Sequence, residues 1–261
     1  MPKLAANLSM MFNEVDFLDR FGAAAKAGFK AVEYLFPYAY PKEQIAERLA
    51  AHGLGQVLFN LPPGNWEAGE RGLAIMPDRI GEFQDGVGRA IDYAKALGCR
   101  RIHAMAGVAP AKMHPARLRE TYVSNLKFAA AEAAKAGLTL VIEPINTRDI
   151  PGYYLCTSTQ ALAIIGAVGA ANLKLQYDIY HAQIMEGDLA HTFEKNLAMI
   201  GHVQIADTPG RHEPGTGEIN YNFLLGFMDK LGYQGWIGCE YRPLGDTVAG
   251  LAWAKPYLAA R

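Results

Sequence analysis

The chain has 261 residues, of which 51% are hydrophobic and 20% charged, and its formal net charge is −1. A nearly neutral chain without a basic region offers no electrostatic field for nucleic acid or for an anionic membrane surface, so neither is an expected partner. Its three cysteines are widely spaced and its N-terminal apolar run is too short for a signal peptide, which excludes a disulfide framework and predicts a soluble cytoplasmic protein.

Short apolar segments alternate with amphipathic helical patterns along the whole chain. Strands are predicted at residues 3–10, 29–35, 55–60, 99–105, 138–144, 173–180, 201–207 and 235–241. Helices are predicted at residues 16–27, 42–52, 82–97, 115–136, 158–168, 189–199 and 220–231. Several helices are followed by a glycine just before the next strand, as at Gly53 and Gly137, which is typical of a helix that turns back into a parallel strand.

Eight strands alternating with helices over this length predict a single (β/α)8 barrel domain spanning residues 1–261. A doubly wound open sheet has the same alternation, but no glycine-rich phosphate loop follows the first strand. One segment, residues 60–79, has no periodicity and contains three prolines and three glycines. It follows a strand on the side where barrel loops form the active-site mouth, so we expect a lid or substrate loop there.

Oxygen-bearing side chains end four successive strands. Glu143, Asp178 and Glu240 stand at the ends of predicted strands, and Gln204 lies near the end of another. Because these ends meet at one rim of a barrel, the four side chains should point to a common centre. Three ionised carboxylates cannot crowd together without a cation, and oxygen ligands select magnesium or manganese over zinc. The sequence therefore predicts a divalent metal site.

Two further residues near these strand ends are candidates for binding. His181 follows Asp178 closely and could bond substrate or metal-bound water, whereas Arg211 lies in the loop after Gln204 and could hold an anion. His103 and His202 lie within strand patterns, and we expect them to be core histidines.

Motifs from one end of the chain to the other are similar to a known family. They are ANLSMMF, NLPPGNWEAGERG, IEPIN, QYDIYH, HVQIAD, RHEPGTGEINY and GCEY. Together they resemble the hydroxypyruvate isomerase family, which belongs to the xylose isomerase-like barrels. The resemblance implies interconversion of hydroxypyruvate and tartronate semialdehyde in glyoxylate metabolism, with metal ligands at Glu143, Asp178, Gln204 and Glu240. Ketose 3-epimerases of the same superfamily usually have histidine where Gln204 stands, so an epimerase is disfavoured.

The resemblance implies acid and base roles for Glu143 and Glu240, and the chemistry agrees with it. Moving a carbonyl to the adjacent carbon requires removing one proton and returning another, and a metal would stabilise the enediolate between these steps. A direct hydride shift is the alternative, but it gains nothing from the acidity of a C–H group beside a carbonyl. The carboxylate of the substrate needs a cation, for which Arg71 and Arg211 are the candidates by position.

Three other functions share parts of this pattern. A 2-oxo-tetronate isomerase would use the same motifs on a longer acid. A phosphodiesterase or apurinic-site nuclease would need a histidine-rich zinc cluster and a basic groove. A sugar-acid binding protein would not need two carboxylates on a metal. In each isomerase case the partner is a small 2-oxo acid or sugar acid, and a homo-oligomer is possible.

Overall fold

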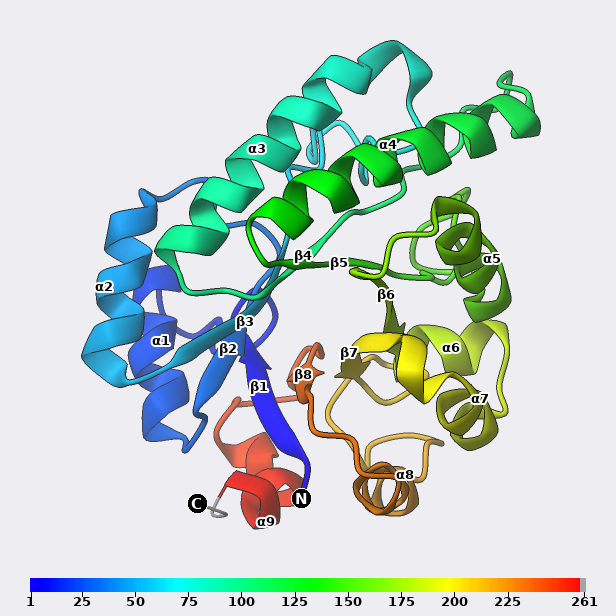
Figure 1. The fold of residues 1–261 in the computed structure, drawn as a ribbon. Coiled ribbons are helices and arrows are strands. Elements are labelled where there is room, and N and C mark those ends of the chain that lie inside the picture. The colour runs from blue at the N-terminus through cyan, green and yellow to red at the C-terminus, as the bar shows by residue number, and fades with distance from the viewer. Residues whose placement is uncertain (259–261) are drawn as a thin grey trace.

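The computed structural model describes residues 1–258, and in it eight parallel strands close into a barrel surrounded by helices (Figure 1). The strands are β1 (Lys3–Asn7), β2 (Ala31–Glu33), β3 (Gly55–Asn60), β4 (Arg101–His103), β5 (Thr139–Ile142), β6 (Leu173–Asp178), β7 (Ile200–Ile205) and β8 (Trp236–Cys239). Each strand pairs with its neighbours in chain order, and β1 pairs with β8, with Leu4 opposite Ile237. The predicted (β/α)8 barrel is confirmed.

The helices lie outside the strands, and their buried faces form the core together with residues of the strands and loops. They are α1 (Phe17–Lys26), α2 (Lys42–His52), α3 (Ile80–Ala96), α4 (Pro115–Lys135), α5 (Ser158–Val168), α6 (Ile179–Met185), α7 (Leu189–Asn196), α8 (Tyr221–Lys230) and α9 (Lys255–Leu258). Gly53 and Gly137 have the positive φ angles of 61° and 68° that a left-handed helix end requires. Among residues 1–258, no helix is both long and apolar enough to cross a membrane.

Most of the predicted strands are longer than the observed ones, as at residues 3–10, where β1 ends at Asn7, and one of these differences affects the site. The strand expected to run to residue 180 ends at Asp178, and α6 begins at Ile179. The reason is local, because the Asp178 carboxylate accepts the backbone N–H of Tyr180 at 2.8 Å and so caps the helix. Asp178 therefore ends a strand and starts a helix, which turns His181 toward the barrel mouth.

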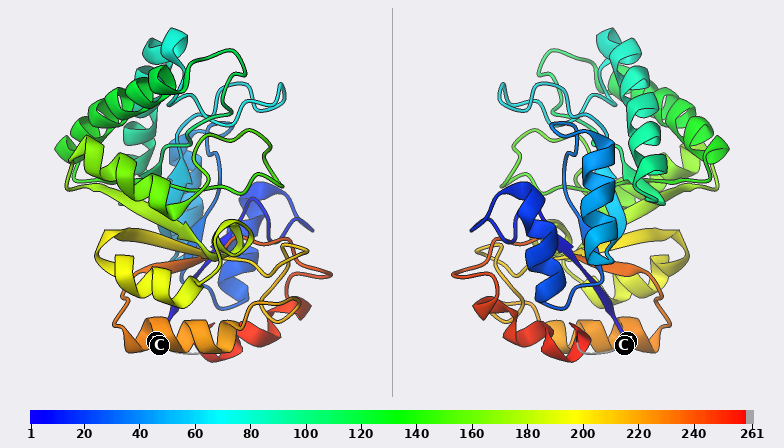
Figure 2. Two further views of the ribbon diagram at one scale, coloured as in Figure 1. Left: turned by 90° about the vertical axis from the view of Figure 1, so that its right-hand side faces the viewer. Right: turned by 90° about the vertical axis from the view of Figure 1, so that its left-hand side faces the viewer.

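The loops that follow the strands gather at one end of the barrel (Figure 2). The segment predicted to be irregular contains neither helix nor strand between β3 and a 3₁₀ turn at Pro77–Arg79. It is nonetheless firmly attached to the barrel. Gly72 has a φ of 117°, and a Cβ at this position would overlap the backbone of Met105, so only glycine permits this approach.

Candidate active site at the carboxyl end of the barrel

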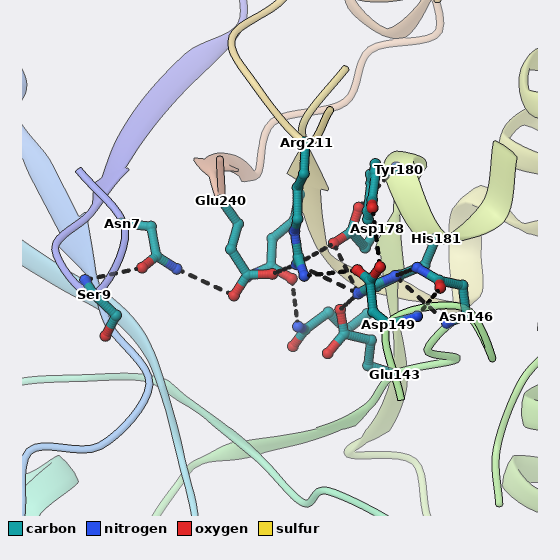
Figure 3. A network of polar contacts seen from close by, with 12 residues as sticks. Asn7, Ser9, Glu143, Asn146, Asp149, Asp178, Tyr180, His181, Arg211 and Glu240 are labelled. Atoms are coloured by element: carbon teal, nitrogen blue, oxygen red, sulfur yellow. Dashed lines mark hydrogen bonds and ion pairs between the residues drawn. The ribbon is translucent and has the colours of Figure 1, made fainter. Parts of the chain in front are cut away.

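Four titratable side chains meet at the carboxyl ends of β5, β6 and β8. Glu143 directly follows β5, Asp178 ends β6, His181 lies in the first turn of α6, and Glu240 directly follows β8. All four are at most 5% exposed, and one ligand atom from each lies within 4.8 Å of the others. Figure 3 shows these side chains pointing toward one another, Glu143 and Glu240 from separate strand ends and Asp178 and His181 from the junction of β6 and α6. The structure thus brings together the three carboxylates that the strand ends predict, with His181 beside them.

Two of these carboxylates have an oxygen that accepts no hydrogen bond, although Arg211 Nη2 lies 3.7 Å from the one on Asp178. Glu143 Oε1 and Asp178 Oδ2 are buried and accept no hydrogen bond from the residues described. Leaving a buried carboxylate oxygen unpaired is costly, so such atoms mark a place where a cation or a ligand donor fits. The pair faces the space that Glu240 also lines, and an oxygen-rich set of this kind suits a hard divalent ion.

The three carboxylates of this cluster repel one another when they are ionised. Burial raises the pKa of Glu143 well above its ordinary value, and the nearby Glu240 and Asp178 carboxylates raise it further. Burial likewise raises the pKa of Asp178, and it raises the pKa of Glu240 to about 8, although Arg211 counteracts part of each shift. The pKa of His181 falls well below its usual range because of burial and the Arg211 charge, so its ring is neutral. The site therefore favours protonated carboxyls or an added cation.

Gln204 lies in β7 directly beside Asp178 in the strand register. Its Nε2 donates to Glu33 Oε1 at 2.8 Å, and its Oε1 accepts from Gln176 Nε2 at 2.6 Å. These two bonds hold the amide in a buried polar layer inside the barrel. The structure therefore places Gln204 next to the carboxylate cluster, with its oxygen bonded to Gln176.

Glu33 is the centre of this polar layer, and our sequence reading did not find it. Its carboxylate is fully buried and accepts from Asn7 Nδ2 at 3.1 Å, from Gln204 at 2.8 Å and from His202 Nε2 at 2.7 Å. Room for it comes from Gly238, where a Cβ would overlap the carboxylate. The missed signal was a lone acidic residue in the apolar strand AVEYL, the same pattern that identified Glu143.

The two histidines expected in the core are buried, but they are part of the polar network. His202 bonds Glu33, as described, and His103 Nδ1 lies 3.1 Å from Asn60 Oδ1 and 3.7 Å from Glu143 Oε2. Both histidines therefore take part in polar contacts as well as in packing. Asn7 connects the layer to the cluster, because its Nδ2 also donates to Glu240 Oε1 at 3.2 Å (Figure 3).

Arg211 reaches into the cluster from the loop after β7. Its Nη2 donates to Glu240 Oε2 at 2.7 Å and lies 3.7 Å from Asp178 Oδ2, while its Nη1 donates to Asp149 Oδ2 at 3.3 Å. The guanidinium carbon lies 4.9 Å from the centre of the Tyr180 ring. Burial alone would lower the pKa of Arg211, but these carboxylates raise it above the usual value. Arg211 is thus a half-buried cation that already pairs with carboxylates of the protein.

A buried aspartate shapes the loop that presents Arg211. Asp207 accepts four backbone N–H groups, from Thr208 at 3.0 Å, Gly215 at 2.9 Å, Gly217 at 3.0 Å and Ile219 at 3.1 Å. Arg211 itself has a φ of 56°, a left-handed conformation that a residue with a long side chain adopts rarely. The bonds to Asp207 hold the loop in which this conformation persists.

Arg71 approaches the same cavity from the segment between β3 and α3. Its Nη1 donates to the carbonyl oxygens of Trp66 and Glu70 at 2.8 and 2.7 Å, and its guanidinium carbon lies 3.8 Å from the centre of the Trp66 ring. Trp66 in turn packs against Phe36 at 5.0 Å. Within residues 1–258, no carboxylate forms an ion pair with Arg71, in contrast to Arg211.

The cavity that these residues surround has a volume of about 670 Å³, within the usual range for small-molecule sites. Glu143, His181, Arg211 and Glu240 line this cavity, and Arg71 and Trp66 line it from the irregular segment. All the residues expected to bind substrate, His181, Arg71 and Arg211, therefore lie on one cavity.

A closed eightfold barrel with a cavity lined by buried carboxylates at its carboxyl end is the arrangement of a (β/α)8-barrel enzyme. Comparison with known proteins agrees with this class, because the family described as "Xylose isomerase-like TIM barrel" matches residues 21–257. The chain belongs to this family.

Individual relatives cover the chain almost completely. The chain is similar to a protein of Cupriavidus necator named 2-oxo-tetronate isomerase, with 58% identity over 99% of both chains. It is also similar to a protein of Escherichia coli named hydroxypyruvate isomerase, with 51% identity over 98% of this chain and 100% of the relative. A crystal structure from Brucella melitensis titled "AP endonuclease, family 2" has a TM-score of 0.97 and 49% identity, covering 98% of this chain and 99% of the other. The resemblance inferred from the motifs is confirmed.

Proposed function

We propose that this protein is an isomerase that moves a carbonyl group between adjacent carbons of a small 2-oxo acid by proton transfer. Hydroxypyruvate and tartronate semialdehyde are the first substrate pair to consider, and a 2-oxo-tetronate is the alternative. The observation that carries this proposal is that two buried carboxyls, Glu143 and Glu240, line one cavity and both have a raised pKa. The names of the relatives support the same reaction class.

We propose that Glu143, Asp178, Gln204 and Glu240 would hold a magnesium or manganese ion. The unpaired oxygens of Glu143 and Asp178 and the mutual repulsion of the carboxylates support this assignment. When bound, such an ion would polarise the substrate carbonyl and stabilise the negative charge that develops on the neighbouring oxygens. For Gln204 to contribute its oxygen, the bond from Gln176 must be exchanged.

Glu143 and Glu240 would transfer the protons. One carboxylate removes the proton from the carbon next to the carbonyl, which leaves an enediolate, and a carboxylic acid on the other side returns a proton to the neighbouring carbon. Glu240 is held for this role by Asn7 on one oxygen and by Arg211 on the other. Burial raises the pKa of Glu240 when no cation is bound, and a divalent ion would favour the carboxylate form that can accept a proton.

Arg71 is the better candidate for binding the substrate carboxylate. Three carboxylates, one divalent ion and Arg211 sum to no net charge, so a substrate anion finds no excess positive charge at the floor of the cavity. Arg211 already bonds Glu240 and Asp149, whereas Arg71 bonds only carbonyl oxygens and has further donors available. Arginine can meet a planar carboxylate with two parallel hydrogen bonds.

The decisive experiment follows the reaction by proton NMR in deuterated water. Protein treated with a chelator and then supplied with Mg²⁺ or Mn²⁺ is incubated with hydroxypyruvate or with a 2-oxo-tetronate, and Glu143→Gln serves as the inactive control. We expect metal-dependent isomerisation of at least one acid with incorporation of deuterium at the reacting carbon. Isomerisation without exchange would support a hydride shift instead. Cleavage of an abasic-site DNA duplex without turnover of either acid would refute the proposal.

A further inference from the structure

His181 is held at its Nδ1 atom by two donors from one residue. Nδ2 of Asn146 lies 2.6 Å from Nδ1, and the backbone N of Asn146 lies 3.4 Å from it. The orientation of the Asn146 amide is defined independently, because its Oδ1 accepts the backbone N–H of Asp149 at 2.7 Å. The amide NH₂ group must therefore be the part that faces the ring. Two N–H donors require an acceptor, so Nδ1 carries a lone pair.

The other ring nitrogen faces the carboxylate cluster. Nε2 lies 3.6 Å from Asp178 Oδ2 and 3.9 Å from Glu143 Oε1, the two oxygens that lack a partner. Arg211 Nη2 lies 3.4 Å from Nε2 and, as a donor, would favour a lone pair there. This contact is the weaker one, because the same Nη2 donates to Glu240 at 2.7 Å, whereas the contact of Asn146 at Nδ1 is short.

We propose that Asn146 is a positioning residue that fixes the neutral His181 ring with its proton on Nε2. His181 then donates a hydrogen bond into the cavity and offers no lone pair to a metal there. This assigns the nearby histidine to a substrate oxygen and leaves metal binding to the oxygen ligands. Both residues are buried, with exposures of 0% and 3%, so water does not compete for Nδ1. Only the kinetic consequence of this inference rests on the proposed isomerase function.

The protonation of the ring can be observed directly by NMR. Protein labelled with ¹⁵N in its seven histidines is studied in chelator and with Mg²⁺, and the His181 signals are assigned by their loss in His181→Gln. In the wild type we expect Nδ1 to be unprotonated and Nε2 to be protonated. In Asn146→Asp, a carboxylate that can only accept faces Nδ1, so Nδ1 should become protonated. A proton on Nδ1 in the wild type, or an unprotonated Nδ1 in Asn146→Asp, would overturn the proposal.

A kinetic comparison then tests the role of the donated hydrogen bond. Removing a donor to a developing negative charge typically lowers kcat by roughly 10²–10³-fold. We expect Asn146→Asp to show such a loss, with a smaller change in KM. The matched control is Asn220→Asp, because Asn220 caps α8 through an accepting oxygen that aspartate also supplies. If the NMR result holds but Asn146→Asp turns over like the control, His181 does not donate in the reaction. If Asn146→Asp fails to fold, the wild-type spectrum decides about the proton.

Discussion

Replacing Arg71 with methionine tests the assignment of the substrate carboxylate most directly. Methionine keeps an unbranched side chain that can still pack on Trp66, but it removes the charge and the hydrogen-bond donors. A charge-assisted hydrogen bond contributes about 1.5–3 kcal/mol, so we expect kcat/KM for a 2-oxo acid to fall roughly 10- to 150-fold. A change confined to KM would mean that Arg71 binds substrate and transition state equally, whereas a fall in kcat would mean that it positions the reacting carbons.

The control for this experiment comes from the same segment. Arg79 forms ion pairs with Glu70 and Glu82 and does not line the cavity. Arg79→Met should therefore leave kcat/KM within a few-fold of the wild type while removing an arginine from the same region. Both variants are compared on the acid and on a neutral analogue without the carboxylate. If Arg71→Met keeps the wild-type preference for the acid, Arg71 does not bind the carboxylate and the charge argument is wrong.

Three further predictions concern the buried carboxyls. Glu240→Gln should lower turnover by roughly 10²–10⁴-fold with an unchanged circular dichroism spectrum, and activity within about tenfold of the wild type would contradict its acid–base role. Glu33→Gln should lower the free energy of unfolding in urea by about 1–3 kcal/mol, because the NH₂ group of the new glutamine would face one of the three side chains that donate to the Glu33 carboxylate. The control is Glu43→Gln, at an exposed position. Because the pKa of Glu240 rises from 4.5 to about 8 on folding, the folded state keeps a proton that the unfolded state releases, so the stability of chelated protein should fall as pH rises through this window. Mg²⁺ should flatten that slope by binding the deprotonated carboxylates, and an equal slope with and without Mg²⁺ would argue against the metal site.

Most of the fold could be predicted from the hydrophobic periodicity of the strands and helices and from the glycines that follow several helices. Alternating strands and helices, with glycines after several helices, specify a parallel barrel because a left-handed helix end and a short turn return the chain to the next strand. Most predicted strands were longer than the observed ones, and at the end of β6 one side chain outweighed the local pattern. Ile179 and Tyr180 continue an apolar strand by composition, yet the Asp178 carboxylate caps a helix at that point.

Some residues of the candidate site could likewise be predicted from the sequence, and others could not. Glu143, Asp178 and Glu240 could be placed together because every strand end of a barrel faces the same rim. Glu33 was missed although it has the same sequence pattern, since nothing local shows that residues of β1, β7 and β8 surround it. Asp149 and Asn146 were missed because they lie in a loop, and loop conformation depends on contacts that periodicity does not describe.

The sequence by itself determined the barrel, its register of polar strand ends and the family. The barrel and its polar strand ends follow from short-range preferences repeated eight times, whereas the family follows from the resemblance of motifs along the chain. Only the tertiary structure decided the partners of each charge. It showed that Arg211 is paired with Glu240 and Asp149 whereas Arg71 is not paired with a carboxylate, and that Asn146 faces His181. Such pairings depend on ångström distances between residues far apart in the chain, and the free energy of a buried charge depends on those distances far more than on its place in the sequence.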